Sequence, residues 1–446
     1  MISCRKTHPP APLPCTGGGK AILVCLAIAL SNVAAAQTAA VDSKVAAIEQ
    51  QVIAWRRDIH QHPELSNRET RTAALVARHL QSLGIEVRTG VAKTGVVGVL
   101  KGAKPGRVIA LRADMDALPV EEQTGLPFAS KVTAEYNGKT VPVMHACGHD
   151  AHTAILMGAA QVLAGMRNQI PGTVVFIFQP AEEGPPIGEQ GGASEMIKEG
   201  ALSNPKPDAI FGLHVEPGVP GRIDVRYGPL LSSATDLRID LQGRQTHGAR
   251  PWEGTDLINL SADIVKSLTT LSARQVDVFD VPNVVTIGMM QAGVRGNILP
   301  GDATLQGTIR TFSEERLHRL QELIDTSVEG LAKSYGATAQ VSYRKQAHVT
   351  GSDPKILESI MPALKEAAGA AGVDTRAPLR AAAEDFSFFE REIPGVYYII
   401  GSTRDFKDKA STPSNHSPRF DIDERVLAIG VKAQVLTALQ FLRAKP

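Results

Sequence analysis

Aromatic residues make up only 4% of this 446-residue chain, and its formal net charge is +1. No run of the sequence is rich in lysine and arginine. Proteins that bind nucleic acids need clustered cations, and many also stack bases on aromatic rings. The composition therefore predicts no nucleic-acid partner.

The N-terminus lacks an apolar run long enough to cross a bilayer, since the run over residues 21–30 is too short. Arg5, Lys6 and Lys20 make this end basic, and small residues at Ala34 and Ala36 suit cleavage after Ala36. These features predict a signal peptide over residues 1–36, export to the periplasm or the medium, and no stable membrane anchor. Cleavage removes three positive charges and changes the net charge from +1 to −2.

Cysteine is also scarce. Cys4, Cys15 and Cys25 fall within the predicted signal peptide, so the mature chain keeps only Cys147. A single thiol cannot form an internal disulfide. Because Cys147 lies between two histidines, we interpret it as a thiol held by a metal ion.

The length and the apolar patterns predict two domains. Residues 45–84 have a helical pattern, and strands alternating with helices follow, which predicts an α/β domain with a largely parallel sheet. The expected strands are 96–100, 108–114, 174–178 and 209–214, and the expected helices are 153–165 and 192–200.

A different pattern begins near residue 230. The expected elements are a strand at 236–241, a helix at 256–274, strands at 283–290 and 303–312, a helix at 313–335 and a strand at 339–344. This βαββαβ order is typical of a ferredoxin-like domain. A helix over 354–371, a strand over 396–401 and a helix over 423–444 complete the chain. We therefore predict a larger domain formed by 45–230 and 346–446, with a smaller domain, 231–345, inserted into it.

The segment His145-Ala146-Cys147-Gly148-His149-Asp150-Ala151-His152 holds three imidazoles, a thiol and a carboxylate in eight residues. Nitrogen and sulfur ligands at such spacing suit a transition metal, above all zinc. The alternative is a polar loop whose histidines face solvent.

Acids and a histidine also follow the predicted strands. Asp114 and Asp116 follow one strand, Glu182 and Glu183 another, and His214 ends a third. In open α/β sheets, ligands bind beyond the carboxyl ends of the strands. The alternatives are turn residues for the aspartates, a core histidine for His214 and solvated charge for the two glutamates. As adjacent residues, Glu182 and Glu183 point in different directions, so that one can bind metal and the other can accept a proton from metal-bound water.

These motifs together resemble the metal-dependent amidohydrolases of the aminoacylase and carboxypeptidase type, in the branch of the hippurate hydrolases and the plant indole-acetyl-amino-acid hydrolases. The resemblance extends from about residue 54 to 441. The motifs that carry it are Arg-Arg-Asp-Ile-His-Gln-His-Pro-Glu-Leu (56–65), Leu-Arg-Ala-Asp-Met-Asp-Ala-Leu-Pro (111–119), Met-His-Ala-Cys-Gly-His-Asp-Ala-His-Thr (144–153), Phe-Gln-Pro-Ala-Glu-Glu (178–183), Gly-Leu-His (212–214), Ala-Glu-Asp-Phe-Ser (383–387) and Asn-His-Ser-Pro (415–418).

The resemblance implies a zinc-peptidase-like catalytic domain that binds one or two divalent ions, zinc or manganese, with nickel or cobalt as further options. The metal ligands it implies are Cys147, His149, Glu183, His214 and His416. Glu182 matches the general base of the family. Asp114 and Asp116 are expected to orient ligands, and His145, Asp150 and His152 to support the site.

The inserted domain is implied to act as a lid and to form a homodimer or a higher homo-oligomer. His247 matches a histidine that polarises the scissile carbonyl, in some members across a dimer. Asn297 and Arg310 match positions that contact the substrate, and a guanidinium suits its carboxylate. The alternative for Arg310 is an exposed strand residue.

The resulting prediction is hydrolysis of the amide bond of a small N-acyl amino acid, which releases a carboxylic acid and a free amino acid. An exported dipeptidase or carboxypeptidase would use the same metal site. A solute-binding protein is the non-enzymatic alternative, because two domains and a hinge also suit capture of a ligand.

Overall fold

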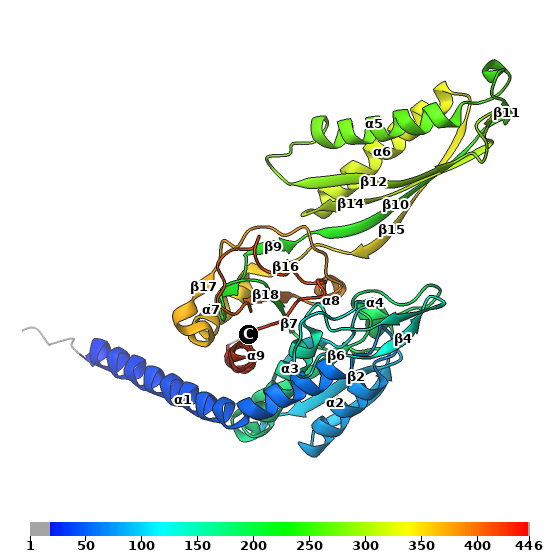
Figure 1. Ribbon diagram of the computed structural model, residues 1–446. Helices are drawn as coiled ribbons and strands as arrows, with labels where there is room; N and C mark the ends of the chain where they lie inside the picture. The colour runs from blue at the N-terminus through cyan, green and yellow to red at the C-terminus, as the bar shows by residue number, and fades with distance from the viewer. Residues whose placement is uncertain (1–17, 445–446) are drawn as a thin grey trace, which may run out of the picture.

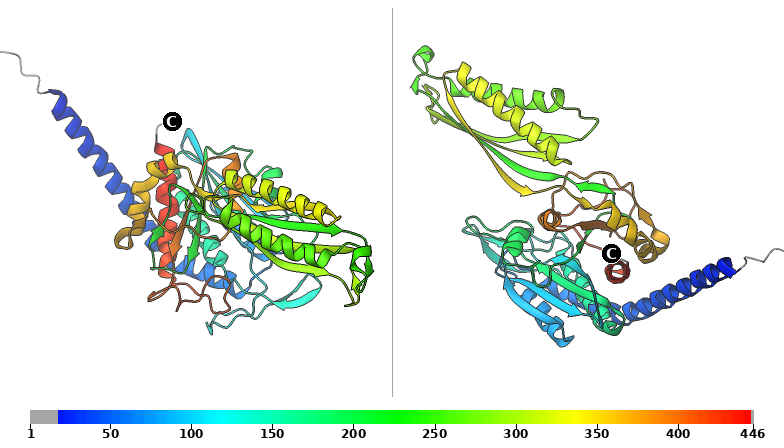
Figure 2. Two further views of the ribbon diagram at one scale, coloured as in Figure 1. Left: turned by 90° about the horizontal axis from the view of Figure 1, so that it is seen from above. Right: turned by 180° about the vertical axis from the view of Figure 1, so that it is seen from behind.

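The computed structural model describes the backbone of residues 18–444 and the side chains of residues 36–444. It consists of a large α/β body and a smaller body, built on a four-stranded sheet and two helices, that extends from it (Figure 1). The N-terminal part of helix α1 (Gly18–Gln61) projects from the large body in all three views (Figures 1 and 2). The predicted cleavage site after Ala36 lies within α1, and residues 1–17 of the predicted signal peptide lie outside the described residues.

Four neighbouring parallel strands form the centre of the large sheet, in the order β6 (Pro171–Gln179), β3 (Lys104–Asp114), β7 (Ala209–Glu216) and β18 (Gly395–Gly401). The expected α/β fold is confirmed, but the sheet is mixed. Strands β1 (Glu86–Val91) and β2 (Gly95–Lys101) pair antiparallel beside β6, because a short turn between them permits only a hairpin.

Shorter strands complete the large body. Strands β16 (Thr350–Ser352) and β9 (Gly228–Leu231) extend the sheet beyond β18. Strand β8 (Ile223–Asp224) pairs with both β18 and β17 (Val373–Asp374). Strands β4 (Thr133–Tyr136) and β5 (Lys139–Pro142) form a separate hairpin. The helices of this body are α1, α2 (Thr70–Ser82), α3 (His149–Ala164), α4 (Gly192–Lys198), α7 (Pro354–Ala368), α8 (Phe386–Glu392) and α9 (Arg425–Arg443).

Both faces of the central strands are buried, which explains their almost continuous apolar sequences. On one face, Leu111, Phe176 and Phe211 belong to a core cluster that also contains apolar residues of α3, α7 and α9. On the other face, Ile177 belongs to a cluster that includes Met196 of α4. Among the described residues, only α9 is long and apolar enough to cross a membrane, and 72% of its apolar window is buried inside the protein. This helix is therefore accounted for as a core helix.

The smaller body has the expected βαββαβ order, β10 (Ser233–Gln242), α5 (Leu257–Arg274), β12 (Asn283–Ala292), β14 (Asp302–Thr311), α6 (Glu314–Ser334) and β15 (Thr338–Ala347). All strand pairs in its sheet are antiparallel, in the order β12-β14-β10-β15. Apolar side chains of both helices, such as Ile264 and Ile324, pack on Ile239 and Leu305 of the sheet. A short ribbon of β11 (Thr246–His247) and β13 (Ile298–Leu299) lies at the end of this body farthest from the large sheet (Figure 1).

Candidate active site

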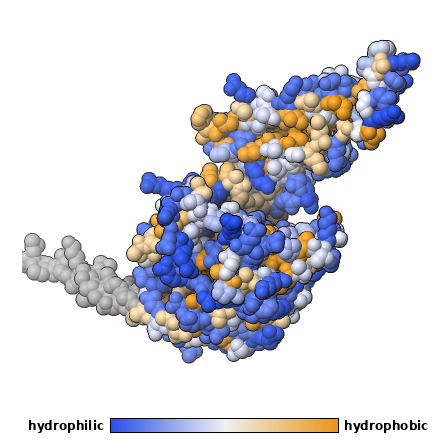
Figure 3. Space-filling model, in the orientation of Figure 1, coloured by the Kyte–Doolittle hydropathy of each residue, from blue (hydrophilic) through white to orange (hydrophobic). Residues whose placement is uncertain are grey.

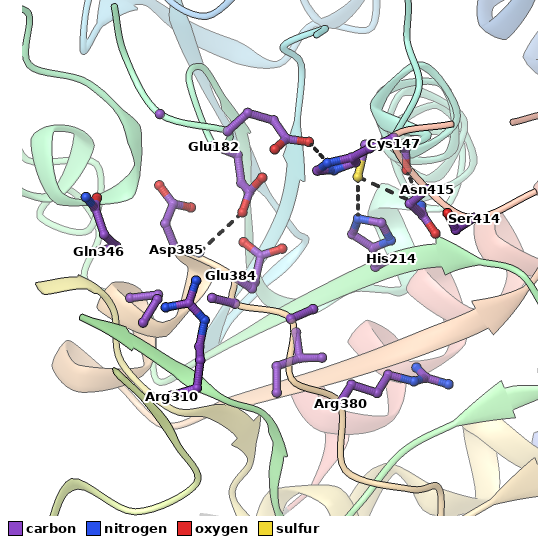
Figure 4. A pocket seen from close by; sticks show the side chains of 18 of the residues that line it. Cys147, Glu182, His214, Arg310, Gln346, Arg380, Glu384, Asp385, Ser414 and Asn415 are labelled. Carbon is purple, nitrogen blue, oxygen red and sulfur yellow. Dashed lines mark hydrogen bonds and ion pairs between the residues drawn. The ribbon is translucent and has the colours of Figure 1, made fainter. Parts of the chain in front are cut away.

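The five predicted metal ligands meet beyond the carboxyl ends of the central strands. Four of them line a cavity of about 1060 Å³, and Figure 4 labels two of these, Cys147 and His214. The Sγ atom of Cys147 lies 3.4 Å from Nε2 of His214, and Nε2 of His416 lies 3.0 Å from Oε1 of Glu183. His149, the first residue of α3, is fully buried beside them. Candidate ligand atoms lie within 4.8 Å of one another in each of three overlapping sets: Cys147, His149 and His214; Cys147, Glu183 and His416; and His149, Glu182 and Glu183.

Gly148 allows Cys147 and His149 to share this site. It caps the N-terminus of α3 with φ +96°, a conformation that side chains other than glycine rarely adopt. A Cβ atom at this position would lie 2.4 Å from Cγ2 of Val215, the residue after His214. The turn therefore depends on glycine both for its backbone angles and for the close approach of β7.

A second turn delivers the two glutamates after β6. Ala181 has φ +53°, and its N–H donates to Oε1 of the buried Glu69 at 2.9 Å. The N–H of Glu183 donates to Oδ2 of Asp116 at 3.0 Å. These two bonds hold the turn on either side of Glu182.

The histidine rings are oriented so that their Nε2 atoms are available for a cation. Nδ1 of His149 donates to the carbonyl oxygen of Asp116 at 2.8 Å, and Nδ1 of His214 donates to that of Val215 at 2.9 Å. Among the described residues, no hydrogen-bond partner reaches the buried Nε2 atom of His149. Bonds of this kind fix the tautomer of a metal-binding histidine. The donor set of thiol, imidazoles and carboxylate thus fits a divalent transition metal.

The electrostatics of the cluster also favour a cation. Burial, followed by the carboxylates of Glu183 and Glu182, raises the pKa of the Cys147 thiol well above its usual range. Burial lowers the pKa of His214 well below normal, whereas at His149 burial is outweighed by Asp114 and Asp116, which raise its pKa to about 10. A divalent cation would stabilise the thiolate and the neutral imidazoles that bind it.

Asp114 and His152 form a buried hydrogen-bonded pair beside the candidate ligands. Oδ1 of Asp114 accepts a hydrogen bond from Nδ1 of His152 at 2.6 Å, and Nε2 of His152 accepts one from the Val215 N–H at 2.9 Å. Both ring nitrogens of His152 are therefore occupied by protein partners. His145 is buried as well, and neither of its ring nitrogens has a hydrogen-bond partner among the described residues.

His416 reaches the cavity from a loop near the C-terminus that the large body anchors. Its N–H donates to the carbonyl oxygen of Ala146 at 2.7 Å, and it has φ +67°. The preceding residue, Asn415, donates through Nδ2 to the carbonyl oxygens of Cys147 at 2.9 Å and Val215 at 3.2 Å. The loop is thus attached to both segments that carry Cys147 and His214.

Of the three predicted residues in the smaller body, only Arg310 lines the cavity. It lies on β14, half-buried, and Figure 4 shows it on the same side of the cavity as Asp385. His247 on β11 and Asn297 just before β13 are exposed on the distal ribbon and do not line the cavity. Within one chain, the structure therefore does not bring His247 and Asn297 close to the predicted metal ligands. The reason is that their ribbon lies at the end of the smaller body farthest from the large sheet.

A buried polar network beside Glu182 was not assigned from the sequence. Glu182, Glu384 and Asp385 place carboxylate oxygens within 4.8 Å of one another, and burial, followed by Glu384 and Glu183, raises the pKa of Glu182 well above its usual range. The buried Arg112 bonds to both residues of the pair Glu384–Asp385. The motif at 383–387 indicated that this segment belongs to the site, but no sequence pattern showed its contact with Glu182.

Comparison with known proteins agrees with this arrangement. The family model described as peptidase family M20/M25/M40 matches residues 110–440. The thermostable carboxypeptidase 1 of Saccharolobus solfataricus is 40% identical over 397 residues, which cover 88% of this chain and 96% of that protein. The N-acyl-L-amino acid amidohydrolase of Geobacillus stearothermophilus is 38% identical over 313 residues, covering 69% and 80%.

The crystal structure of the Bacillus subtilis YXEP protein, described as a dinuclear metal-binding peptidase of the M20 family, superimposes with a TM-score of 0.74 at 34% identity. It covers 89% of this chain and 99% of that one. The match covers nearly the whole chain, so that the two folds agree. This chain belongs to peptidase family M20/M25/M40 and is a metallo-amidohydrolase.

Proposed function

We propose that this protein hydrolyses the amide bond of N-acyl amino acids and releases a carboxylic acid and a free amino acid. The observation that carries the proposal is that one cavity contains the metal-ligand cluster, the carboxylate of Glu182 and the guanidinium of Arg310. The relatives named N-acyl-L-amino acid amidohydrolase and N-acetylcysteine deacetylase support this substrate class.

Cys147, His149, Glu183, His214 and His416 would hold one or two divalent ions, and zinc suits the sulfur and nitrogen donors best, with manganese as the alternative. When bound, such an ion supplies an acidified water and positive charge for the carbonyl oxygen.

Glu182 is the residue placed to move the proton. Its Oε1 atom accepts a hydrogen bond from the Asp385 N–H at 3.4 Å, and its Oε2 atom lies 3.9 Å from Nε2 of His149. Oε2 therefore faces the metal ligands, where it can take a proton from the attacking water and return it to the leaving amine. Burial, followed by the carboxylates of Glu384 and Glu183, raises the pKa of Glu182 well above its usual range.

Arg310 is placed to bind the carboxylate of the amino-acid part. Its guanidinium donates to Thr308 Oγ1, and no carboxylate of the described residues lies within ion-pair distance of it. The other two arginines that line the cavity are already paired, Arg344 with Asp236 at 2.8 Å and Arg380 with Asp224 at 2.7 Å. A free guanidinium in a partly desolvated cavity is suited to a bidentate bond with a substrate carboxylate.

We further propose that the protein forms a homodimer through its smaller body, in which His247 of one subunit completes the site of the other. Strand β12 is an edge of the four-stranded sheet and exposes Val284, Met289 and Met290. Apolar residues are visible on this body in Figure 3. An apolar edge strand readily pairs with a second chain. The exposed His247, remote from its own cavity, would then be a donor to the oxyanion in trans.

A carboxypeptidase or dipeptidase is the second candidate, because relatives 40% identical over 88% of this chain carry the name carboxypeptidase. Both reactions need Arg310 for the substrate carboxylate and Glu182 for proton transfer. The test is a hydrolysis screen after metal reconstitution, over N-acetyl, N-benzoyl and other N-acyl amino acids and over dipeptides with the same C-terminal residue. Faster hydrolysis of the dipeptides would favour the carboxypeptidase or dipeptidase.

Glu182→Gln separates catalysis from binding in that screen. We expect kcat to fall at least 100-fold with the metal content unchanged. Arg310→Met should raise KM for substrates with a free carboxylate and not for their methyl esters. Binding of these compounds by the reconstituted wild type without hydrolysis would favour a solute-binding protein instead.

Export is also part of the proposal. The basic, then apolar, N-terminal segment supports a signal peptide that is cleaved near Ala36. N-terminal sequencing of protein recovered from the periplasm or the medium would test both the cleavage and its position.

A further inference from the structure

We propose that Arg112 is a positioning residue for catalysis, which holds Glu182 in register with the metal ligands by joining the segments that carry them. The inference rests on the proposed role of Glu182. Arg112 lies on β3 and is 1% exposed, and it is not among the residues that line the cavity. It therefore acts on the site through other residues.

The guanidinium of Arg112 uses all three of its nitrogens. Nη1 donates to Oδ2 of Asp114 at 2.6 Å, and Nε donates to Oε1 of Gln179 at 2.8 Å. Nη2 donates to Oε1 of Glu384 at 2.9 Å and to Oδ1 of Asp385 at 3.1 Å. One side chain thus joins the ends of β3 and β6 to a segment more than 270 positions later.

Each of these partners is attached in turn to a residue of the site. Asp114 accepts from His152 and lies 3.9 Å from Nε2 of His149. Asp385 is held by the side chain of Gln179 at 2.7 Å and by the Ala193 N–H at 2.7 Å, and its own N–H donates to Oε1 of Glu182. Arg112 therefore links Asp114, which lies beside His149, to Asp385, which bonds Glu182. Figure 4 shows Glu182, Glu384 and Asp385 together.

The charges explain why an arginine stands here. Glu182, Glu384 and Asp385 would repel one another in a buried space, and Arg112 is the cation that bonds the last two. A lysine carries the same charge but cannot form four bonds in one plane. Loss of the guanidinium should therefore release the 384–385 segment and let Glu182 move.

The experiment compares Arg112→Met, Arg112→Lys and Gln179→Leu with the wild type, all reconstituted with zinc. A displacement of about 1 Å can reduce a rate about 100-fold. We expect kcat to fall about 100-fold in Arg112→Met with KM within about twofold, and to fall less in Arg112→Lys. Gln179→Leu, which keeps the ion pairs, should lie between the wild type and Arg112→Met.

A second measurement does not depend on activity. Hydrogen exchange of the metal-free protein should speed up at the amides of residues 384–386 in Arg112→Met, while the amides of α5 in the smaller body keep their wild-type rates. This readout tests the positioning claim even if the screen above refutes the amidohydrolase proposal.

Arg56→Met is the matched control. Arg56 is also 1% exposed and also bonds three carboxylates, those of Asp150 at 2.7 Å, Asp421 at 3.1 Å and Glu424 at 3.4 Å, but no residue of the Glu182 network. It should lose stability as Arg112→Met does and keep kcat within about twofold. Equal losses of kcat in the two variants, or unchanged exchange at 384–386, would overturn the proposal.

Discussion

Gly148 provides a sharp test of how the proposed metal ligands are positioned. It separates Cys147 from His149, and two physical effects at this position can be told apart. In Gly148→Ala, the new residue must adopt φ +96°, and left-handed backbone costs a residue with a side chain about 1–2 kcal/mol. Its Cβ atom would also lie 2.4 Å from Cγ2 of the buried Val215, and overpacking of this kind typically costs about 1–3 kcal/mol. The two effects predict a loss of about 2–5 kcal/mol.

Val215→Ala removes the clashing methyl group and leaves the backbone strain. In a double-mutant cycle, Gly148→Ala should therefore cost about 1–3 kcal/mol less in the Val215→Ala background than in the wild type. The free energy of unfolding is measured by urea denaturation with a chelator present, so that changes in metal binding do not contribute. Metal titration of the same variants should show weaker binding in Gly148→Ala.

Two results would refute this reasoning. If Gly148→Ala unfolded with a free energy within about 0.5 kcal/mol of the wild type, neither the strain nor the contact would exist as described. If the loss were the same in both backgrounds, the contact with Val215 would not contribute, and the whole effect would be that of the backbone.

Three further predictions concern other parts of the site and the junction between the two bodies. Asn415→Leu removes the side-chain donor to the carbonyl oxygens of Cys147 and Val215. It should weaken metal binding about 10- to 100-fold in a competition titration. An unchanged metal affinity would show that these bonds do not orient His416. Glu314 is partly buried, but its bonds to His348 and Lys345 lower its pKa to about 2. Because folding lowers this pKa, the ionised Glu314 stabilises the folded state above pH ~4.5, and this contribution is lost as the pH falls towards ~2. After allowance for solvent screening, the contribution to the free energy of unfolding is about 1 kcal/mol. The stability gap between the wild type and Glu314→Gln should close over that range, and a gap independent of pH would contradict the assignment. Chelation should lower the Tm of the wild type and scarcely change the Tm of a Cys147→Ala, His214→Ala double variant. If chelation lowered both Tm values equally, the metal would bind elsewhere.

The sequence predicted the elements of both bodies well, because the apolar patterns that define them are local. Strands such as 174–178 and 209–214 are buried on both faces and appear as short apolar runs, and α5 and α6 show one apolar side each. The antiparallel pairing of β2 with β6 was missed, since an apolar run gives no information on the direction of its neighbour.

The sequence by itself determined which residue types could bind a metal: the thiol and imidazoles at 145–152, and the acids and the histidine at the strand ends. Their meeting depended on the common rule that parallel strands end at one edge of the sheet. Only the tertiary structure decided which of them have free ligand atoms. His152 and His149 lie on the same helix three residues apart, yet both nitrogens of His152 are occupied and Nε2 of His149 is free. Likewise, Arg310 lines the cavity and His247 does not, because His247 lies on the short ribbon at the end of the smaller body farthest from the large sheet. Hydrogen-bond partners and distances between segments far apart in the chain arise from packing, and no local pattern encodes them.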